Sequence, residues 1–157
     1  MHDPLNPHSH DPNPEPPSAD PSFLLTMPNG RSHTITINDL HSLPQTTVAN
    51  HYIVSTGHGT SGPFQFAGVT LLDLLTHYSV DFGHPFSVEV ISADGFGNRI
   101  QRDELLNPDS AGPMLLCLTL QQQPMTREQG LVRLIVPNEK DDALRQVKWV
   151  GKINVVQ

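Results

Sequence analysis

A chain of 157 residues with 36% hydrophobic content is long enough for one domain with a buried core and too short for two ordinary domains. Its formal net charge of −7, without a basic patch interleaved with aromatic residues, argues against a nucleic-acid-binding protein. A single cysteine excludes an internal disulfide and a multi-cysteine zinc or iron–sulfur site, and it fits a reducing compartment.

The sequence also bears on location. It contains no run of about 18 apolar residues, the length needed to cross a bilayer as a helix. The first residues lack the basic and apolar regions of a secretory signal. We therefore expect no transmembrane segment and a cytoplasmic location, or a periplasmic one if a signal peptide has been removed.

Residues 1–21 differ in composition from the rest of the chain. They contain seven prolines and four acidic residues, and no lysine or arginine. Proline removes backbone donors and the segment has almost no apolar surface to bury, so we predict a disordered tail with polyproline-II character. Its histidines could bind a stray divalent metal, but ordering such a tail costs about 1–2 kcal/mol per residue. We therefore predict no metal site there, and one folded domain over residues 22–157.

The first half of that domain is predicted to contain short strands and two helical segments. The expected elements are strands over 23–27 and 33–37 around a tight turn, a helical turn over 38–44, a strand over 46–55, a loop over 56–63 and a helix over 71–78. Asn38 or Asp39 can cap the helical turn. Thr70 can cap the later helix, with Asp73 at its third position. The buried stripe of that helix is expected to comprise Leu71, Leu74, Leu75 and Tyr78.

The second half adds strands and one more short helix. The expected elements are a strand over 86–92, a turn over 94–98, a short helix capped around 101–103, a strand over 114–120, a turn over 121–125 and strands over 130–136 and 147–155. The run 114–120 is almost continuously apolar, which is typical of a central strand. This order of elements predicts an α+β domain with a mixed β-sheet of about eight short strands and a few short helices.

The last segment, residues 130–155, contains two apolar strands around a charged loop. In the first strand, alternate residues share a face: Val132, Leu134 and Val136 on one side, Arg133 and Ile135 on the other. In the second strand, the residues expected to face the core are Val147, Trp149, Ile153 and Val155. Three cations would then lie on or near the opposite face: Arg145, Lys148 and Lys152. They form either an ordinary solvated strand face or an anion site, in which each charged hydrogen bond to a phosphate contributes about 1.5–3 kcal/mol.

The loop over 56–63 is a second candidate binding element. Its three glycines allow close backbone approach to a ligand, and its hydroxyls and amides could hold a phosphate or an oxyanion. The alternative is an ordinary flexible connection. Cys117 lies inside the apolar run 114–120, where a cysteine is more often a small inert hydrophobe than a ligand.

Four sequence motifs point to one known family of domains. They are Phe-x-Phe-x-Gly-Val-x-Leu-x-Asp-Leu-Leu from residue 64, Ser-Ala-Asp-Gly-Phe from residue 92, Arg-Leu-Ile-Val-Pro from residue 133 and Arg-x-Val-Lys-Trp-x-x-x-Ile from residue 145. Together they resemble the sulfite-oxidase-type molybdopterin-binding oxidoreductase domain, over residues 35–156. The resemblance implies the α+β fold of that family. It also implies that Arg145 and Lys148 help to hold the pterin and phosphate of a molybdenum cofactor.

The chain departs from the family pattern at the metal ligand. In active members, a cysteine thiolate at the end of the strand before the glycine-containing loop binds molybdenum, a role that suits a soft, electron-donating group. The corresponding stretch here is Ser55-Thr56-Gly57-His58, which places Ser55 or Thr56 at the ligand position. Three outcomes are open: a serine alkoxide on the metal, a cofactor held by its dithiolene and phosphate alone, or a fold without cofactor.

The resemblance also directs attention to the histidines near the loop. His51 and His58 could contact the pterin or its phosphate, although a histidine in a loop is usually a surface residue. The expected cofactor-binding set is His51, Gly57, His58, Arg145 and Lys148.

Two functions follow as hypotheses. The first is an atypical molybdopterin-binding oxidoreductase-like domain. Because the sequence carries no haem or flavin motif, its electrons would pass through a separate partner protein. The second is a non-catalytic module that reuses the fold to bind an anion or a protein.

Overall fold

The computed structural model describes residues 21–55, 59–107, 113–126, 129–136 and 146–157, and the side chains of 49–63 are outside the description. The predicted tail lies almost entirely outside the described residues. The helices are α1 (Ile37–His41), α2 (Leu71–His77) and α3 (Arg102–Leu106). The strands are β1 (Phe23–Thr26), β2 (Ser32–Ile35), β3 (Thr46–Ser55), β4 (Gly59–Thr70), β5 (Ser87–Ser92), β6 (Gly97–Gln101), β7 (Leu115–Leu120), β8 (Gln123–Pro124), β9 (Arg133–Ile135) and β10 (Val150–Val156).

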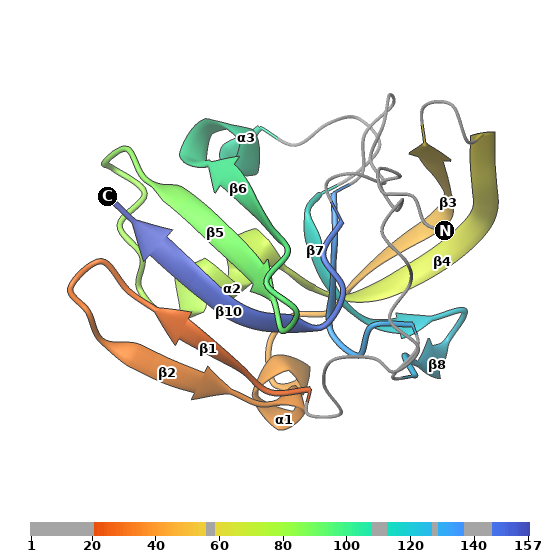
Figure 1. The fold of residues 1–157 in the computed structure, drawn as a ribbon, viewed down its shortest axis with the longest axis horizontal. Coiled ribbons are helices and arrows are strands. Elements are labelled where there is room, and N and C mark those ends of the chain that lie inside the picture. Colours follow the sequence, from red (N-terminus) through yellow and green to blue (C-terminus); the bar gives the residue numbers. More distant parts are fainter. Residues whose placement is uncertain (1–20, 56–58, 108–112, 127–128, 137–145) are drawn as a thin grey trace.

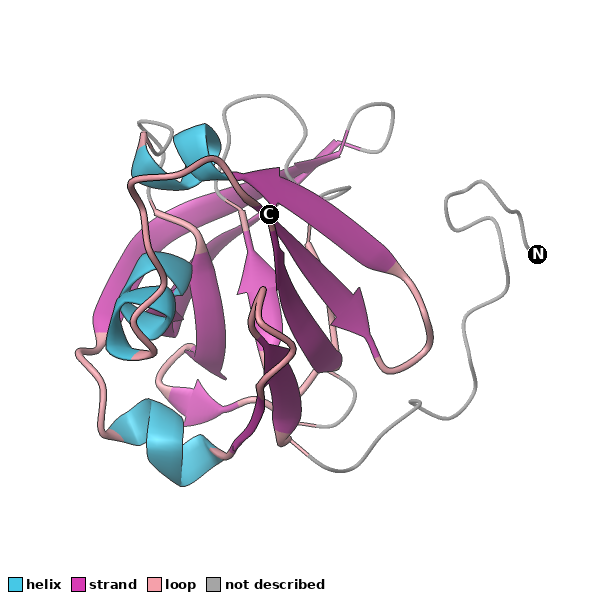
Figure 2. Ribbon diagram, turned by 90° about the vertical axis from the view of Figure 1, so that its left-hand side faces the viewer, coloured by secondary structure: helices cyan, strands magenta, loops and turns pink. Residues whose placement is uncertain are grey.

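These strands form two five-stranded sheets that lie side by side in Figure 1. The first sheet has the order β2-β1-β10-β5-β6 and is mixed, because β10 runs parallel to β1 and antiparallel to β5. The second sheet has the order β3-β4-β7-β8, with β9 also paired to β7. The three helices lie on one side of the sheets in Figure 2. The α+β fold with mixed β-structure predicted from the sequence is confirmed.

Two apolar clusters fill the interior, and β7 contributes to both. Leu116 and Leu118 join the larger cluster, which also takes in the buried side chains of β1, α2, β5 and β10. Leu115 and Cys117 face the smaller cluster, together with Phe66. Because β7 is covered on both faces, its sequence is apolar at consecutive positions, as expected for a central strand.

The strand β9 divides its residues in the same way. Leu134 belongs to the larger cluster and Ile135 to the smaller one. Val132 and Val136, which flank the strand, also belong to the larger cluster. The predicted alternation of residues 132–136 is therefore confirmed, with Arg133 on the side of the smaller cluster.

The helix ends follow local chemistry. The helix α2 has Thr70 as its N-cap, which accepts a hydrogen bond from the Asp73 backbone N–H at 3.0 Å, as predicted. The N-cap of α1 is Thr36, and not Asn38 or Asp39 as predicted, because a capping box joins the Thr36 hydroxyl and the Asp39 carboxylate to each other's backbone N–H groups. The predicted helix near 101–103 is α3.

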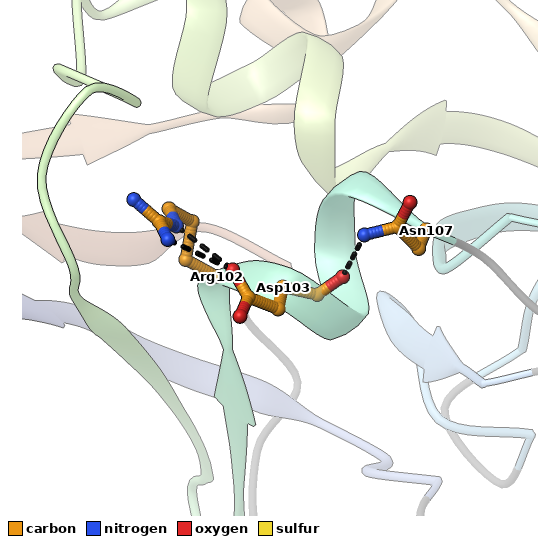
Figure 3. A network of polar contacts seen from close by, with 3 residues as sticks. All are labelled: Arg102, Asp103 and Asn107. Atoms are coloured by element: carbon orange, nitrogen blue, oxygen red, sulfur yellow. Dashed lines mark hydrogen bonds and ion pairs between the residues drawn. The ribbon is translucent and has the colours of Figure 1, made fainter.

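Both ends of α3 are held by short-range polar contacts, as Figure 3 shows. The Arg102 guanidinium donates to the Asp103 carboxylate at 2.9 and 3.0 Å. The Asn107 side-chain amide donates to the Asp103 backbone carbonyl at 2.9 Å, and the Asn107 backbone N–H donates to the same carbonyl at 3.0 Å. Among the described helices, none has the length and apolar character needed to cross a membrane.

One segment of the second sheet and the β5–β6 hairpin correct the sequence-based expectation. Residues 59–63, predicted as loop, open the strand β4, where Gly59, Thr60 and Ser61 pair with the end of β3. The turn predicted over 94–98 is shorter, because β6 begins at Gly97 and pairs with β5. In both places an adjacent strand provides backbone partners, and pairing overrides the turn-forming composition.

The final strand begins later than predicted. Trp149 does not face the core, because it is half-buried and has a φ of 50°, in the left-handed region. The strand β10 starts at the next residue, and Val150 is buried in its place. Val147, Ile153 and Val155 are buried as predicted.

Candidate functional site

Three polar side chains meet where the segment before β10 passes β9. Leu134 and Val147 form an antiparallel bridge, with backbone N–H to carbonyl distances of 2.8 and 3.1 Å in the two directions. Both of these side chains face the larger apolar cluster. Residues on either side of a bridged pair point to the opposite face, which places Arg133, Gln146 and Lys148 together on the other side. We call these three residues the cation cluster.

Arg133 lies at the centre of this cluster. It is half-buried on β9, where its backbone pairs with Cys117 of β7. Its guanidinium carbon lies 5.9 Å from the centroid of the Phe66 ring, within the range of a cation–π contact. Its Nη2 donates a short hydrogen bond to the Oε1 atom of Gln146. These contacts fix the guanidinium over the smaller apolar cluster.

Gln146 is one of two buried polar residues among those described, and the residue is only 7% exposed. Its Oε1 atom accepts the hydrogen bond from Arg133. Its Nε2 atom is buried and has no hydrogen-bond partner within the described part of the chain. Buried donors are normally satisfied, and an unsatisfied one costs about 1–3 kcal/mol.

Lys148 brings a second positive charge to the cluster. Its Nζ atom lies 5.7 Å from the centroid of the Trp149 ring. The residue is exposed, but nearby protein atoms displace part of the water around its ammonium group, and this desolvation lowers the pKa of Lys148. The positive charge of Arg133 lowers the same pKa further. Two like charges are thus held near each other at the surface of the smaller cluster.

The backbone around the cluster is unusual. Gly130, Leu131 and Trp149 all adopt a positive φ, of 115°, 56° and 50°. The Trp149 N–H donates to the Gly130 carbonyl at 2.9 Å, so the three residues belong to one pair of neighbouring segments. A left-handed conformation at a residue other than glycine costs of order 1–3 kcal/mol and is concentrated at functional sites. Lys148 therefore belongs to a segment whose backbone geometry the surrounding structure imposes, and its side chain begins against Gly130 of the neighbouring segment.

Gly130→Ala should lower the free energy of unfolding by about 1–2 kcal/mol, because alanine is strained at a φ of 115°. The added Cβ would also lie 3.1 Å from Cβ and Cγ of Lys148 and would displace that side chain. Gly30→Ala is the matched control, since Gly30 has a φ of 86° and no atom within 4 Å of its added Cβ. Urea denaturation should show a loss in both variants, and only Gly130→Ala should shift the NMR signals of the Lys148 side chain. Equal signals in the two variants would contradict the close packing of Gly130 against Lys148.

Cys117 lies beneath the cluster but is not available as a thiolate. It is fully buried in β7, and its Sγ–H donates to the Thr119 carbonyl at 2.9 Å. Burial raises the pKa of the thiol to about 12, against the smaller opposing effects of hydrogen bonds and of the Arg133 charge. The group is therefore protonated at neutral pH, whereas a metal ligand must be a thiolate. The predicted buried location of Cys117 is confirmed.

The other residues singled out from the sequence are spread along the chain. Thr56, Gly57, His58 and Arg145 lie outside the described residues. For His51 and Ser55 the structure describes the backbone alone, in β3, where they pair with Phe64 and Gly59 of β4. The convergence of this region with Arg145 and Lys148 stays a prediction.

Lys152, the third of the expected cations, belongs to a different environment. It lies within β10, exposed, between Leu24 of β1 and Ile91 of β5 in the first sheet. The cation that accompanies Lys148 is Arg133, for which the sequence pattern predicts a strand face but no role. One sequence feature could have indicated a role for Arg133: it is the single charged residue in an otherwise apolar run, on the face opposite Val132, Leu134 and Val136. Gln146 gave no such signal.

Comparison with known proteins places the fold. No curated protein matches the chain. A solved structure that does match is the sulfane dehydrogenase SoxCD from Paracoccus pantotrophus, with a TM-score of 0.68 and 17% sequence identity over 95% of this chain. The match spans 41% of that longer chain, and at this identity it shows a shared fold.

A family comparison gives the classification. The sequence model of the oxidoreductase molybdopterin-binding domain matches residues 15–157, nearly the whole chain. This agrees with the resemblance found in the motifs, and the cofactor expected from those motifs is the one named in the family's description. The chain belongs to the oxidoreductase molybdopterin-binding domain family.

Proposed function

We propose that this chain binds a molybdopterin cofactor and that Lys148 and Arg133 hold its phosphate. The observation that carries the proposal is geometric: the Leu134–Val147 bridge sets Arg133 and Lys148 on one face, beside the buried amide of Gln146. A phosphate between the two cations would offset their repulsion, and both side chains suit it, because arginine offers a planar fork and lysine a point charge. The lowered pKa of Lys148 agrees with this role, since perturbed pKa values are common at binding sites.

The cluster fits the phosphorylated end of such a cofactor in two further ways. Gln146 provides a buried donor beside the cations. The Phe66 ring and the smaller apolar cluster exclude water from one side of the guanidinium. Charge-assisted hydrogen bonds are stronger in such partly dry surroundings than in open water.

The remaining contacts are proposed from the sequence motifs. Arg145 would add a third cation to the phosphate site. His51, Gly57 and His58 would contact the pterin from the segment that joins β3 to β4. The support for these roles is the family match over residues 15–157, together with the motif that contains Arg145 and Lys148.

The metal-ligand position is proposed to be Ser55 or Thr56, in place of the family's cysteine. When bound, the molybdenum centre supplies two-electron redox chemistry. The only cysteine of the chain is Cys117, and a buried thiol with a pKa of about 12 does not supply the missing thiolate. The proposed activity is therefore that of an atypical oxidoreductase, with electrons passing to a separate partner protein. Family membership favours this function over a module that binds no cofactor.

Metal and pterin analysis of the full chain tests this function. Protein purified from a molybdenum-replete host should contain pterin and molybdenum in near-equal and near-stoichiometric amounts. The control is the same chain from a host that cannot synthesise molybdopterin, which should contain neither. Pterin without molybdenum would support cofactor binding and count against the oxidoreductase activity. Protein without pterin from the replete host would overturn the proposal.

A further inference from the structure

We infer that Gln146 is a cofactor-contacting residue, whose Nε2 amide donates a hydrogen bond to the phosphorylated end of the molybdopterin. This inference rests on the proposed function and adds to it a residue that neither the motifs nor the family match assigns. It depends on three features of the cation cluster: the fixed orientation of the amide, its burial, and its position on the same face as two cations.

The orientation of the amide follows from its arginine partner. A guanidinium can only donate hydrogen bonds, so the Gln146 atom that faces Arg133 Nη2 must be the acceptor, Oε1. The Nε2 atom is then directed to the other side of the amide group. The usual uncertainty about which way a glutamine side chain is turned is removed by this contact.

The burial of the amide makes its open donor significant. Gln146 is only 7% exposed, and its Nε2 atom has no hydrogen-bond partner within the described part of the chain. A glutamine whose only role was to accept from Arg133 could be replaced by a residue without this uncompensated donor. A ligand oxygen beside the cluster would give the donor its partner.

The position of the amide determines the kind of ligand atom that it meets. Arg133 lies on one side of Gln146 and shares its face of the paired segments with Lys148. The positive charges of Arg133 and Lys148 attract an anionic oxygen, and a neutral donor beside them adds a hydrogen bond without adding repulsion. The occupant that matches two cations and one amide donor is a phosphate oxygen.

A double-mutant cycle separates direct contact from an effect transmitted through Arg133. The variants are Gln146→Met, Arg133→Met and the double variant, all as full chains loaded with molybdopterin, and the quantity measured is the dissociation rate of the pterin. If Gln146 contacts the cofactor, Gln146→Met should release pterin about tenfold faster in the wild-type background, the loss of one hydrogen bond to a charged group, and should still accelerate release, by a smaller factor, in the Arg133→Met background, where the amide has lost the contact that orients it. If Gln146 only positions Arg133, it should have no further effect once Arg133 is replaced, and the inference is overturned.

A measurement on the unaltered protein covers the case in which Arg133→Met does not fold. The side-chain amide signal of Gln146, assigned by its absence in Gln146→Met, should shift and exchange more slowly when pterin is bound. An unchanged signal would overturn the inference. The control Lys148→Met separates failure of the proposed function from failure of this inference. If the wild-type protein retains no pterin, the proposed function is wrong. If Lys148→Met loses pterin and Gln146→Met retains it, only the role of Gln146 is wrong.

Discussion

Lys148→Met is expected to release bound pterin at least tenfold faster than the wild-type chain, while the melting temperature of the cofactor-free protein stays the same or rises. Both effects have one cause. Desolvation, and then the charge of Arg133, lower the pKa of Lys148, which means that the fold disfavours the charged ammonium when no anion is present. Methionine keeps much of the aliphatic side chain and removes the charge. The cofactor-free fold is then freed of the unfavourable desolvation and repulsion of the ammonium group, and the cofactor no longer has this positive charge to bind.

The destabilisation of the cofactor-free fold by charged Lys148 should depend on pH. A lysine whose pKa is lower in the folded state destabilises the fold at every pH below the folded value, where both states are protonated. That cost fades as pH rises from the folded pKa toward the usual value near 10.5, where the unfolded chain also loses its proton. The melting temperature of Lys148→Met should therefore exceed that of the cofactor-free wild type most clearly at neutral pH. The difference should shrink above the folded pKa.

Lys152→Met is the matched control, since it removes an equal charge from an exposed position within β10. Lys152 lies between two strands of the first sheet and carries none of the contacts that define the cation cluster. Its replacement should leave the pterin dissociation rate within about twofold of the wild type, as expected for an exposed charge. Equal pterin loss from both variants would mean that net charge, and not the location of Lys148, governs binding.

The fold could be predicted from the sequence wherever local pattern decides the structure. The helix α2 was found because Thr70 and Asp73 form a cap and three leucines share one face. The alternation along residues 132–136 was found because side chains in a strand point to opposite faces in turn. Strand β6 and the start of β4 were missed because their pairing partners, β5 and β3, override a composition rich in glycine and serine.

The candidate site was only partly visible in the sequence for a related reason. Lys148 was found through a motif of adjacent residues. Its neighbour Arg133 lies on another strand, and the contact between Arg133 and Gln146 joins residues 13 positions apart. The sequence pattern does not predict the bridge between Leu134 and Val147, which brings the side chains of the cation cluster to one face. The left-handed conformation of Trp149, which moves its ring out of the core, is also set by tertiary contacts.

Gly68→Ala should destabilise the protein by about 3–4 kcal/mol, a loss at the high end for a single substitution. Gly68 lies at an irregularity where β4 meets β7, and its backbone is pressed against that strand. A Cβ at this position would lie 2.0 Å from the Leu116 carbonyl oxygen and 3.0 Å from Cys117 Cα. Both are backbone atoms of a central strand, so the clash is relieved only if β4 and β7 separate. Urea denaturation with an unchanged slope would measure the loss.

Gly151→Ala supplies the comparison for a glycine with room around it. Its Cβ would meet Ala93 at 3.4 Å, an ordinary contact, and an alanine within a strand should gain up to about 1 kcal/mol over glycine. A small effect at both positions would contradict the close approach of β4 to β7. The site should respond as well, because β7 pairs through Cys117 with Arg133 and β4 carries the Phe66 ring beneath it. Gly68→Ala that still folds should therefore release pterin faster, although Gly68 belongs to neither the cation cluster nor its neighbouring segments.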